Sequence, residues 1–195
     1  MPKIKISAIL LAAGQSTRMG GFDKLLLDYK GKKLLQHAVE LLDTLPCQEK
    51  ILVTTPEKLI AVNLPETILT VINPNPQNGQ SESVRLGIGA ATGGSYLFLN
   101  ADQPKLTRKG LLELFKLAEE NPDKIIYPSV NGNPSTPVMF PARFRNDLLA
   151  LRGDTGGRAL REAFSFDCIS FKAENPDDFA DIDFIEDYKK ATGGN

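Results

Sequence analysis

The 195-residue sequence contains one histidine and two cysteines, and this scarcity argues against several kinds of site. The single histidine, His37, is too few for a multi-histidine zinc site or a histidine-dependent catalytic triad. It lies in a helical pattern, so we expect a structural residue. Cys47 and Cys168 are far apart and lack the spacing of metal ligands. This usage is typical of reduced thiols in a cytoplasmic protein.

The chain also lacks an excess of either charge and a long apolar run. Its 23 basic and 24 acidic residues give a net charge of −1, so we expect no binding to nucleic acid. No apolar run approaches the length that spans a membrane, and the start of the chain has no signal-peptide pattern. With 42% hydrophobic residues, residues 1–195 suit a single cytoplasmic domain with a sizeable core.

Strand and helix patterns alternate along the chain. Strands are expected over residues 4–11, 50–54, 68–72, 96–99, 125–127, 138–140 and 168–171, and helices over 33–45, 81–91, 108–120, 144–151, 157–164 and 185–191. This order predicts an α/β fold with three α/β/α layers and a mostly parallel sheet. Because ligands bind at the carboxyl ends of parallel strands, the loops after Leu11, Ile72 and Leu99 should gather at one edge.

The segment after the first strand contains a turn of small residues followed by two cations. The turn, Ala-Ala-Gly at positions 12–14, lets the backbone approach a ligand, and Arg18 and Lys24 bring two positive charges close to it. Such a segment is suited to a polyphosphate. The alternative is that the small residues only let the following helix pack closely. The spacing matches neither a P-loop nor a dinucleotide fingerprint.

Two further loops hold polar residues at predicted strand ends. Asp102, followed by Gln103 and Pro104, is a candidate ligand for Mg²⁺, which favours one or two carboxylates together with water and substrate phosphates. Its alternative role is to cap a turn or helix. The amide and hydroxyls of Gln80, Ser81 and Ser83 suit recognition of a base or ribose, or they only cap the helix that follows.

Two segments near the C-terminus complete the candidates. Asp181 and Asp183 flank Ile182, and we expect them to point to opposite sides, one into the site and one capping the last helix. The alternative is a solvated acidic surface. The glycine-bounded loop 153–158 is a helix cap or a ligand loop. In it, Arg158 either contacts an anionic acceptor or pairs with Glu162 one turn away.

Taken together, these segments resemble the MobA-like nucleotidyltransferases, and within them the molybdenum cofactor cytidylyltransferases. The resemblance runs through almost the whole chain, from the Leu-Ala-Ala-Gly-x-Ser-x-Arg-Met-Gly…Lys motif at residues 11–24 to the Asp-Ile-Asp at 181–183. It implies a GT-A type, Rossmann-like fold that transfers a nucleoside monophosphate to a phosphorylated acceptor with release of pyrophosphate. The implied partners are a nucleoside triphosphate, molybdopterin and a recipient molybdoenzyme apoprotein.

The resemblance also assigns roles to individual residues. The catalytic residues would be Arg18 on the leaving phosphates, Lys24 at the α-phosphate and Asp102. The implied nucleotide site comprises Leu11, Ala12, Ala13, Gly14, Arg18, Lys24, Gln80, Ser81, Ser83 and Asp102. Mg²⁺ would lie on Asp102 and Asp183, with Asp181 as a further candidate. The implied acceptor site comprises Thr136, Pro137, Asp154, Thr155 and Arg158.

The identities of the base and the acceptor depend on smaller differences. Ala-Ala-Gly at 12–14 is similar to the cytidine-using form of the family, whereas the guanosine-using form has Ala-Gly-Gly. The methyl group of Ala13 takes space that glycine would leave for a purine, which favours CTP. However, Ser135-Thr136 replaces the Gly-His that the cytidylyltransferase pattern has before Pro137. The alternatives are therefore a sugar or polyol phosphate acceptor and, in another class, a non-catalytic carrier of a pterin cofactor.

Overall fold

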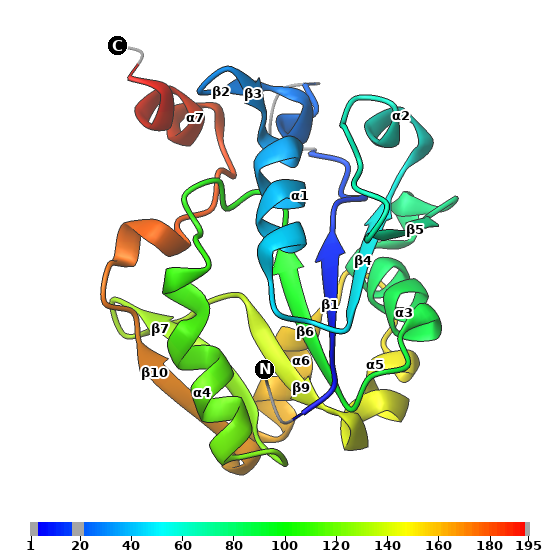
Figure 1. Cartoon of the computed structure of the whole chain (residues 1–195), viewed down its shortest axis with the longest axis vertical. Helices are drawn as coiled ribbons and strands as arrows, with labels where there is room; N and C mark the ends of the chain where they lie inside the picture. Colours follow the sequence, from blue (N-terminus) through cyan, green and yellow to red (C-terminus); the bar gives the residue numbers. More distant parts are fainter. Residues whose placement is uncertain (1–3, 17–21, 194–195) are drawn as a thin grey trace.

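The centre of the fold is a mixed β-sheet in the strand order β10-β7-β9-β6-β1-β4-β5 (Figure 1). The structure is a computed structural model that describes residues 4–16 and 22–193. The strands are β1 (Ile6–Leu11), β4 (Glu49–Thr54), β5 (Leu69–Ile72), β6 (Ser95–Asn100), β7 (Ile125–Val130), β8 (Asn133–Pro134), β9 (Val138–Pro141) and β10 (Cys168–Lys172). A separate small hairpin pairs β2 (Asp28–Tyr29) with β3 (Lys32–Lys33).

Helices cover both faces of this sheet. They are α1 (Leu34–Thr44), α2 (Pro56–Leu59), α3 (Gln80–Ala90), α4 (Leu112–Glu120), α5 (Arg145–Ala150), α6 (Gly157–Ala163) and α7 (Ile185–Thr192). The short 3₁₀ turns include η2 (Lys24–Leu26), η3 (Pro76–Asn78), η4 (Lys109–Leu111), η5 (Ala142–Phe144), η6 (Ser165–Asp167) and η7 (Pro176–Phe179). Helices α1 and α4 lie on one face, and α3, α5 and α6 lie on the other (Figure 1). The predicted three-layer fold is confirmed.

The sheet is mostly parallel, and the four-residue strand β9 within it runs against its neighbours. β1 pairs in parallel with β4 and β6, β4 pairs in parallel with β5, and β7 pairs in parallel with β10. β9 is antiparallel to both of its neighbours, β6 and β7. The excursion that returns the chain through β9 begins with a hairpin, because the turn at Asn131-Gly132 joins β7 to the antiparallel β8.

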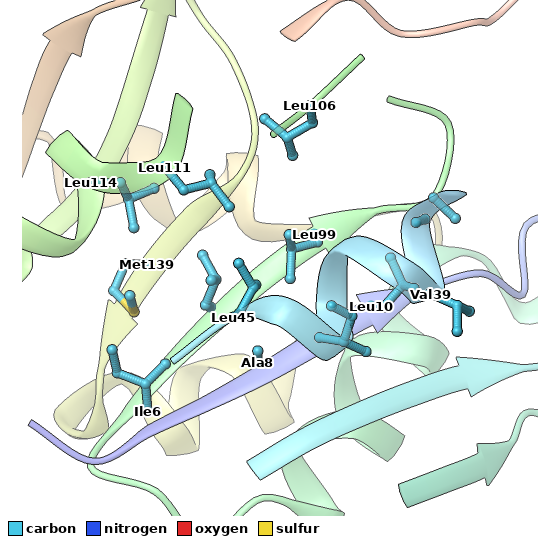
Figure 2. Close-up of a cluster of buried hydrophobic side chains, with 14 of the residues drawn as sticks. Ile6, Ala8, Leu10, Val39, Leu45, Leu99, Leu106, Leu111, Leu114 and Met139 are labelled. Atoms are coloured by element: carbon cyan, nitrogen blue, oxygen red, sulfur yellow. The ribbon is translucent and has the colours of Figure 1, made fainter. Parts of the chain in front are cut away.

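The alternation of β1 builds two cores, one on each face of the sheet. Ile6, Ala8 and Leu10 point toward α1 and α4, where they pack with Val39 and other apolar side chains (Figure 2). Ile9 points the other way, into the core beneath α3, α5 and α6. This two-residue period is that of a strand buried on both faces, and it explains the continuous apolar run in the sequence.

Backbone hydrogen bonds extend past the strand ends and hold the loops at one edge. Ala12 N donates to Val53 O (2.8 Å), Asn73 N donates to Thr54 O (2.8 Å), and Ala101 N donates to Leu11 O (3.3 Å). The first residues after β1, β5 and β6 are therefore fixed at the carboxyl ends of the central strands. Within residues 4–16 and 22–193, no helix is long and apolar enough to cross a membrane.

His37 has the structural role that its helical pattern indicates. It lies on α1, and its Nε2 atom is 2.7 Å from the carbonyl oxygen of Tyr29. Its ring also packs edge-on against the ring of Tyr29. This contact ties α1 to the β2–β3 hairpin.

Candidate active site

A cavity of about 520 Å³ opens at the carboxyl ends of β1 and β6. Its lining combines the loop after β1, the η3 turn and start of α3, the loop after β6, and single residues from two C-terminal loops. The lining residues are Leu11, Ala13, Gly14, Gln15, Ser16, Lys24, Leu25, Pro76, Gln77, Gly79, Gln80, Ser83, Asn100, Ala101, Asp102, Asp154 and Asp183. The prediction that the loops after Leu11, Ile72 and Leu99 gather at one edge is confirmed.

Lys24 lies between two carboxylates at one end of this cavity. Its Nζ atom is 2.6 Å from Asp102 Oδ2 and 2.9 Å from Asp183 Oδ1. The side chains of Lys24 and Asp102 are only 14% and 17% exposed, so water screens the pair weakly. Burial lowers the pKa of Lys24, but the charge of Asp102 and the hydrogen bonds to both carboxylates outweigh it, and the net pKa is raised. The ammonium group is therefore a fixed positive charge at neutral pH.

The backbone fixes these two carboxylates relative to each other, although about 80 residues separate them. Ile182 N donates to the carbonyl oxygen of Asp102 at 2.9 Å. The buried amide of Gln103 donates to Phe179 O at 2.9 Å, just before the same C-terminal segment. The Asp-Gln after β6 thus carries one carboxylate and also secures the segment that carries the other.

The structure corrects the expected orientation of Asp181. Alternate residues of an extended segment share a side, and it is the intervening Ile182 that turns away, into a small cluster with Tyr29 and Leu34. Asp181 retains solvent contact. Although the residue as a whole is exposed, desolvation of its carboxyl group raises its pKa to about 7, and the negative charges of Asp102 and Asp183 raise the pKa further than Lys24 lowers it.

The last helix takes its cap from another residue. The carboxylate of Asp187 accepts hydrogen bonds from Phe184 N at 2.9 Å and from Asp183 N at 3.2 Å, at the start of α7. The carboxylate of Asp187 therefore provides a cap at the start of α7.

The carboxylates of Asp102 and Asp183 fit a divalent cation that is completed by substrate phosphates and water. Asp102 Oδ1 is buried and has no hydrogen-bond partner among residues 4–16 and 22–193, so within this part of the chain one hard oxygen ligand is available without breaking a contact. Across the described residues, no group of three or more histidine, cysteine or acidic side chains forms a metal site by itself. A pair of carboxylates suits Mg²⁺, which keeps several waters and is usually held by one or two carboxylates together with phosphates.

The opposite wall of the cavity is the start of α3, which packs against the loop at 153–156. Gln80 N lies 3.4 Å from Asp154 Oδ1, and Ser81 N donates to Gly153 O at 3.2 Å. The Gln80 side chain lies so close to Gly156 that a Cβ there would be 2.2 Å from Gln80 Oε1. The candidate base-binding and acceptor-binding segments therefore form one continuous surface.

The residues expected to bind the acceptor are only partly brought together. Asp154 lines the cavity. Thr136, which follows Ser135 and precedes the cis-bonded Pro137, contacts the cavity wall through its hydroxyl, 3.4 Å from the Asn100 amide. Asp154 therefore reaches the cavity directly, whereas Thr136 reaches it only through its contact with Asn100.

Thr155 and Arg158 do not line the cavity. Thr155 donates its hydroxyl to the carbonyl oxygen of Arg152, within its own loop. Arg158 is exposed and pairs with Glu162 at 2.7 Å, which is the helical pair that the sequence offers as the alternative to an acceptor contact. The hydrogen bond to Glu162 raises the pKa of Arg158.

The nucleotide-site residues also divide into those that reach the cavity and those that support it. Ala13 and Ser83 line it, whereas Ala12 is buried in the core and Ser81 is buried at the start of α3. Arg18 lies outside the described residues. The sequence interpretation did not include Gln15, Ser16, Leu25, Pro76, Gln77, Gly79, Asn100 and Ala101, which also line the cavity. Each of them lies within a few residues of a named candidate. Extending each candidate to the whole loop that contains it would therefore have included them.

The fold and the position of the cavity are those of a nucleotide-binding α/β protein. Residues 8–168 match the model of the MobA-like NTP transferase domain, and the chain belongs to this family. The family that the sequence motifs resemble is thereby confirmed.

Proteins similar to this chain carry names from different reaction classes. The chain is 31% identical over 123 residues to the "Probable molybdenum cofactor guanylyltransferase" of Rhodopirellula baltica, covering 60% of this chain and 58% of that protein. It is 27% identical over 194 residues to the "Nicotine blue oxidoreductase" of Paenarthrobacter nicotinovorans, covering 93% of each. Among solved structures, the Rv0371c protein of Mycobacterium tuberculosis H37Rv superposes with a TM-score of 0.81 at 19% identity, over 98% of this chain and 99% of that one. A structure of that protein has also been solved in complex with manganese.

Proposed function

We propose that this protein is a nucleotidyltransferase that moves CMP from CTP to the terminal phosphate of molybdopterin and releases pyrophosphate. The observation that carries the proposal is the position of Lys24 between Asp102 and Asp183, in the cavity that the Ala-Ala-Gly loop after β1 also lines. Family membership supports the reaction class. The "Probable molybdenum cofactor guanylyltransferase" relative supports a molybdopterin acceptor, although the chain spans only 58% of its length.

The proposed reaction is an in-line displacement at phosphorus. An oxygen of the acceptor phosphate attacks the α-phosphorus of CTP, a new P–O bond forms, and the bond to the bridging oxygen of the β-phosphate breaks. Pyrophosphate leaves with the electron pair of that bond. The acceptor phosphate is already ionised near neutral pH, so the step needs no strong general base. This agrees with the described part of the cavity lining, in which the charged side chains are those of Lys24, Asp102, Asp154 and Asp183.

Within this reaction, the task of the protein is to position phosphates and to stabilise negative charge. Lys24 would neutralise charge on the α-phosphate, because its ammonium group is held at the cavity wall. Arg18 would hold the leaving phosphates. Asp102 and Asp183 would hold a Mg²⁺ ion, which when bound supplies further positive charge to the phosphates. The backbone at Gly14 and Gln15 lines the same part of the cavity and would face the triphosphate.

The preference for CTP rests on the space beside Ala13. Its side chain is 2% exposed and lines the cavity, so its methyl group occupies volume that a larger base would need. A difference of one carbon in a packed pocket is worth about 1–3 kcal/mol. Because the Rhodopirellula relative is named for guanylyl transfer, the base must be measured directly.

The acceptor is the finer part of the proposal. Ser135 and Thr136 stand where the cytidylyltransferase pattern has Gly-His, and the hydroxyl of Thr136 accepts from the amide of Asn100, which lines the cavity. This departure favours testing a second acceptor class, sugar and polyol phosphates, alongside molybdopterin. The recipient of the finished cofactor would be a molybdoenzyme apoprotein.

The experiment measures pyrophosphate release with CTP, GTP, UTP and ATP, each combined with molybdopterin or with a sugar or polyol phosphate, with and without Mg²⁺. We expect Mg²⁺-dependent release that requires both CTP and molybdopterin. Release with another acceptor would correct the substrate and retain the reaction class. Molybdopterin binding without release from any nucleotide would contradict the enzyme and favour a carrier. Pyrophosphate release must be measured directly, because one relative that matches over 93% of each chain is named as an oxidoreductase.

A further inference from the structure

Lys58 is a buried lysine that contacts the loop after β1 (residues 12–16, called the nucleotide loop below) from outside the cavity. It lies on the single turn of α2, and the whole residue is only 3% exposed. Lysine is almost never buried this completely without a partner. Its Nζ atom donates to the carbonyl oxygen of Gly14 at 2.7 Å and pairs with Asp23 Oδ2 at 2.8 Å. One ammonium group therefore joins residue 14 to residue 23, nine positions further along the chain.

From Asp23, the hydrogen bonds continue to Lys24. Asp23 Oδ1 accepts from Leu25 N at 3.1 Å and lies 3.3 Å from the hydroxyl of Ser16. The same hydroxyl accepts from Lys24 N at 3.2 Å. The backbone of Ser16 has a φ of +52°, a left-handed conformation that surrounding contacts must hold in place. The network thus connects Lys58 with the backbone of both Gly14 and Lys24.

We propose that Lys58 is a positioning residue that fixes the backbone at Gly14 relative to Lys24, so that phosphates contacted by the two are held in one geometry. The inference rests on the proposed function, because it takes the ligand at this loop to be a nucleoside triphosphate. Stability alone gives little reason for a lysine here, since replacing a buried ion pair with apolar groups is often neutral or stabilising. The bond to the Gly14 carbonyl is the contact that an apolar residue could not make.

Lys50 provides a matched control on the neighbouring strand. Its Nζ atom also contacts both a backbone carbonyl and a carboxylate, the carbonyl oxygen and Oδ1 of Asp43, and its side chain is 14% exposed. It lies at the start of β4, whereas Lys58 follows the end of that strand, and it does not line the cavity. Lys50→Met removes the same kind of contact without touching the nucleotide loop.

The test compares Lys58→Met, the double variant Lys58→Met with Asp23→Asn, and Lys50→Met in the full chain. We expect Lys58→Met to raise the KM for CTP by on the order of 10- to 100-fold, because misplacement by about 1 Å is that costly. Lys50→Met should leave KM unchanged. The double variant removes both charges of the ion pair, the buried Lys58 and the partly exposed Asp23, so we expect it to recover thermal stability relative to Lys58→Met. We do not expect it to recover KM, because the bond to Gly14 stays absent.

Two results would overturn the proposal. One is a KM for CTP in Lys58→Met that equals the wild-type value. The other is recovery of both stability and KM in the double variant, which would show that only the buried charge mattered. If Lys58→Met does not fold, the double variant provides the same comparison against Lys50→Met.

Amide hydrogen exchange separates this proposal from the proposed function, because it needs no nucleotide. The amides of Lys24 and Leu25 depend on the Asp23 and Ser16 network. They should exchange at least several-fold faster in Lys58→Met than in Lys50→Met, while amides of the central strands stay unchanged. Unchanged exchange at Lys24 and Leu25 would refute the role of Lys58. Faster exchange in a protein that binds no nucleoside triphosphate would retain the structural tie and refute the function of the site.

Discussion

Two glycines of helix α3 should respond in opposite ways when each is replaced by alanine. Gly79 caps the helix with φ = +87° and ψ = −178°, a backbone conformation that is almost restricted to glycine. A Cβ there would lie 2.5 Å from Gly153 O and 2.7 Å from Asp154 N, both of them backbone atoms. Gly89 lies in the exposed part of the same helix, and a Cβ there would meet nothing within 4 Å.

The magnitudes follow from these two environments. For Gly79→Ala, the strained backbone costs about 1–3 kcal/mol, and overpacking against an immobile backbone costs roughly 1–3 kcal/mol more. The sum of about 2–6 kcal/mol should lower Tm by roughly 4–24 °C, since 1 kcal/mol shifts a chain of this size by about 2–4 °C. Gly89→Ala should instead stabilise the protein by about 0.5–1 kcal/mol, because glycine is the poorer helix former.

Thermal and urea unfolding of both variants, followed by circular dichroism, measure these differences. Nucleotide binding adds a second readout, because the Gly79 turn holds Gln80 against Asp154 at the cavity wall. A Gly79→Ala variant as stable as the wild type would refute the packing of α3 against the 153–156 loop. A destabilised Gly89→Ala variant would refute the open environment of that position.

Three further predictions concern the site and its charges. Asp102→Asn should abolish Mg²⁺-dependent turnover without loss of fold, whereas the control Asp167→Asn, at the other end of the sheet, should remain active. Turnover of Asp102→Asn at the wild-type rate would show that Asp102 is not a metal ligand. Ala13→Gly should raise kcat/KM for GTP relative to CTP by roughly 5- to 150-fold, which corresponds to about 1–3 kcal/mol. An unchanged CTP/GTP ratio of kcat/KM would show that other residues determine the selectivity. In chelator-containing buffer, native Asp181 keeps its proton to about pH 7 whereas the unfolded chain releases it near pH 4, so this residue makes the free energy of unfolding fall as pH rises between these values. Urea unfolding of Asp181→Asn should lack that contribution. Identical dependence of the free energy of unfolding on pH in Asp181→Asn and the wild type would contradict the raised pKa.

The order of strands and helices could be predicted because each β-strand on the central path is apolar and each long helix has one apolar face. The antiparallel insertion of β9 between β6 and β7 could not, because a short apolar run carries no direction. Direction depends on the length and course of the connection. The β7–β8 turn at Asn131-Gly132 was the one local signal for it.

The candidate site was predictable where the chain itself concentrates chemistry after a strand. Lys24 and Asp102 follow strand-associated loops, so topology alone brings them toward one edge. Lys58 was not predictable, because a lysine in a four-residue helix is normally solvent-exposed, and its burial depends on carbonyl and carboxylate groups from another loop. Arg158 shows the converse, since a local partner one turn away competes with any more distant contact.

The measurement that tests the central claim most directly is the fate of the α-phosphorus. CTP labelled at this position is incubated with the protein, Mg²⁺ and molybdopterin, and both the labelled products and pyrophosphate are quantified. We expect the label to appear in a cytidine dinucleotide of molybdopterin, with one pyrophosphate released for each label transferred. Label that remains in CTP, or appears only in CMP or CDP without transfer to any phosphorylated acceptor, would contradict it.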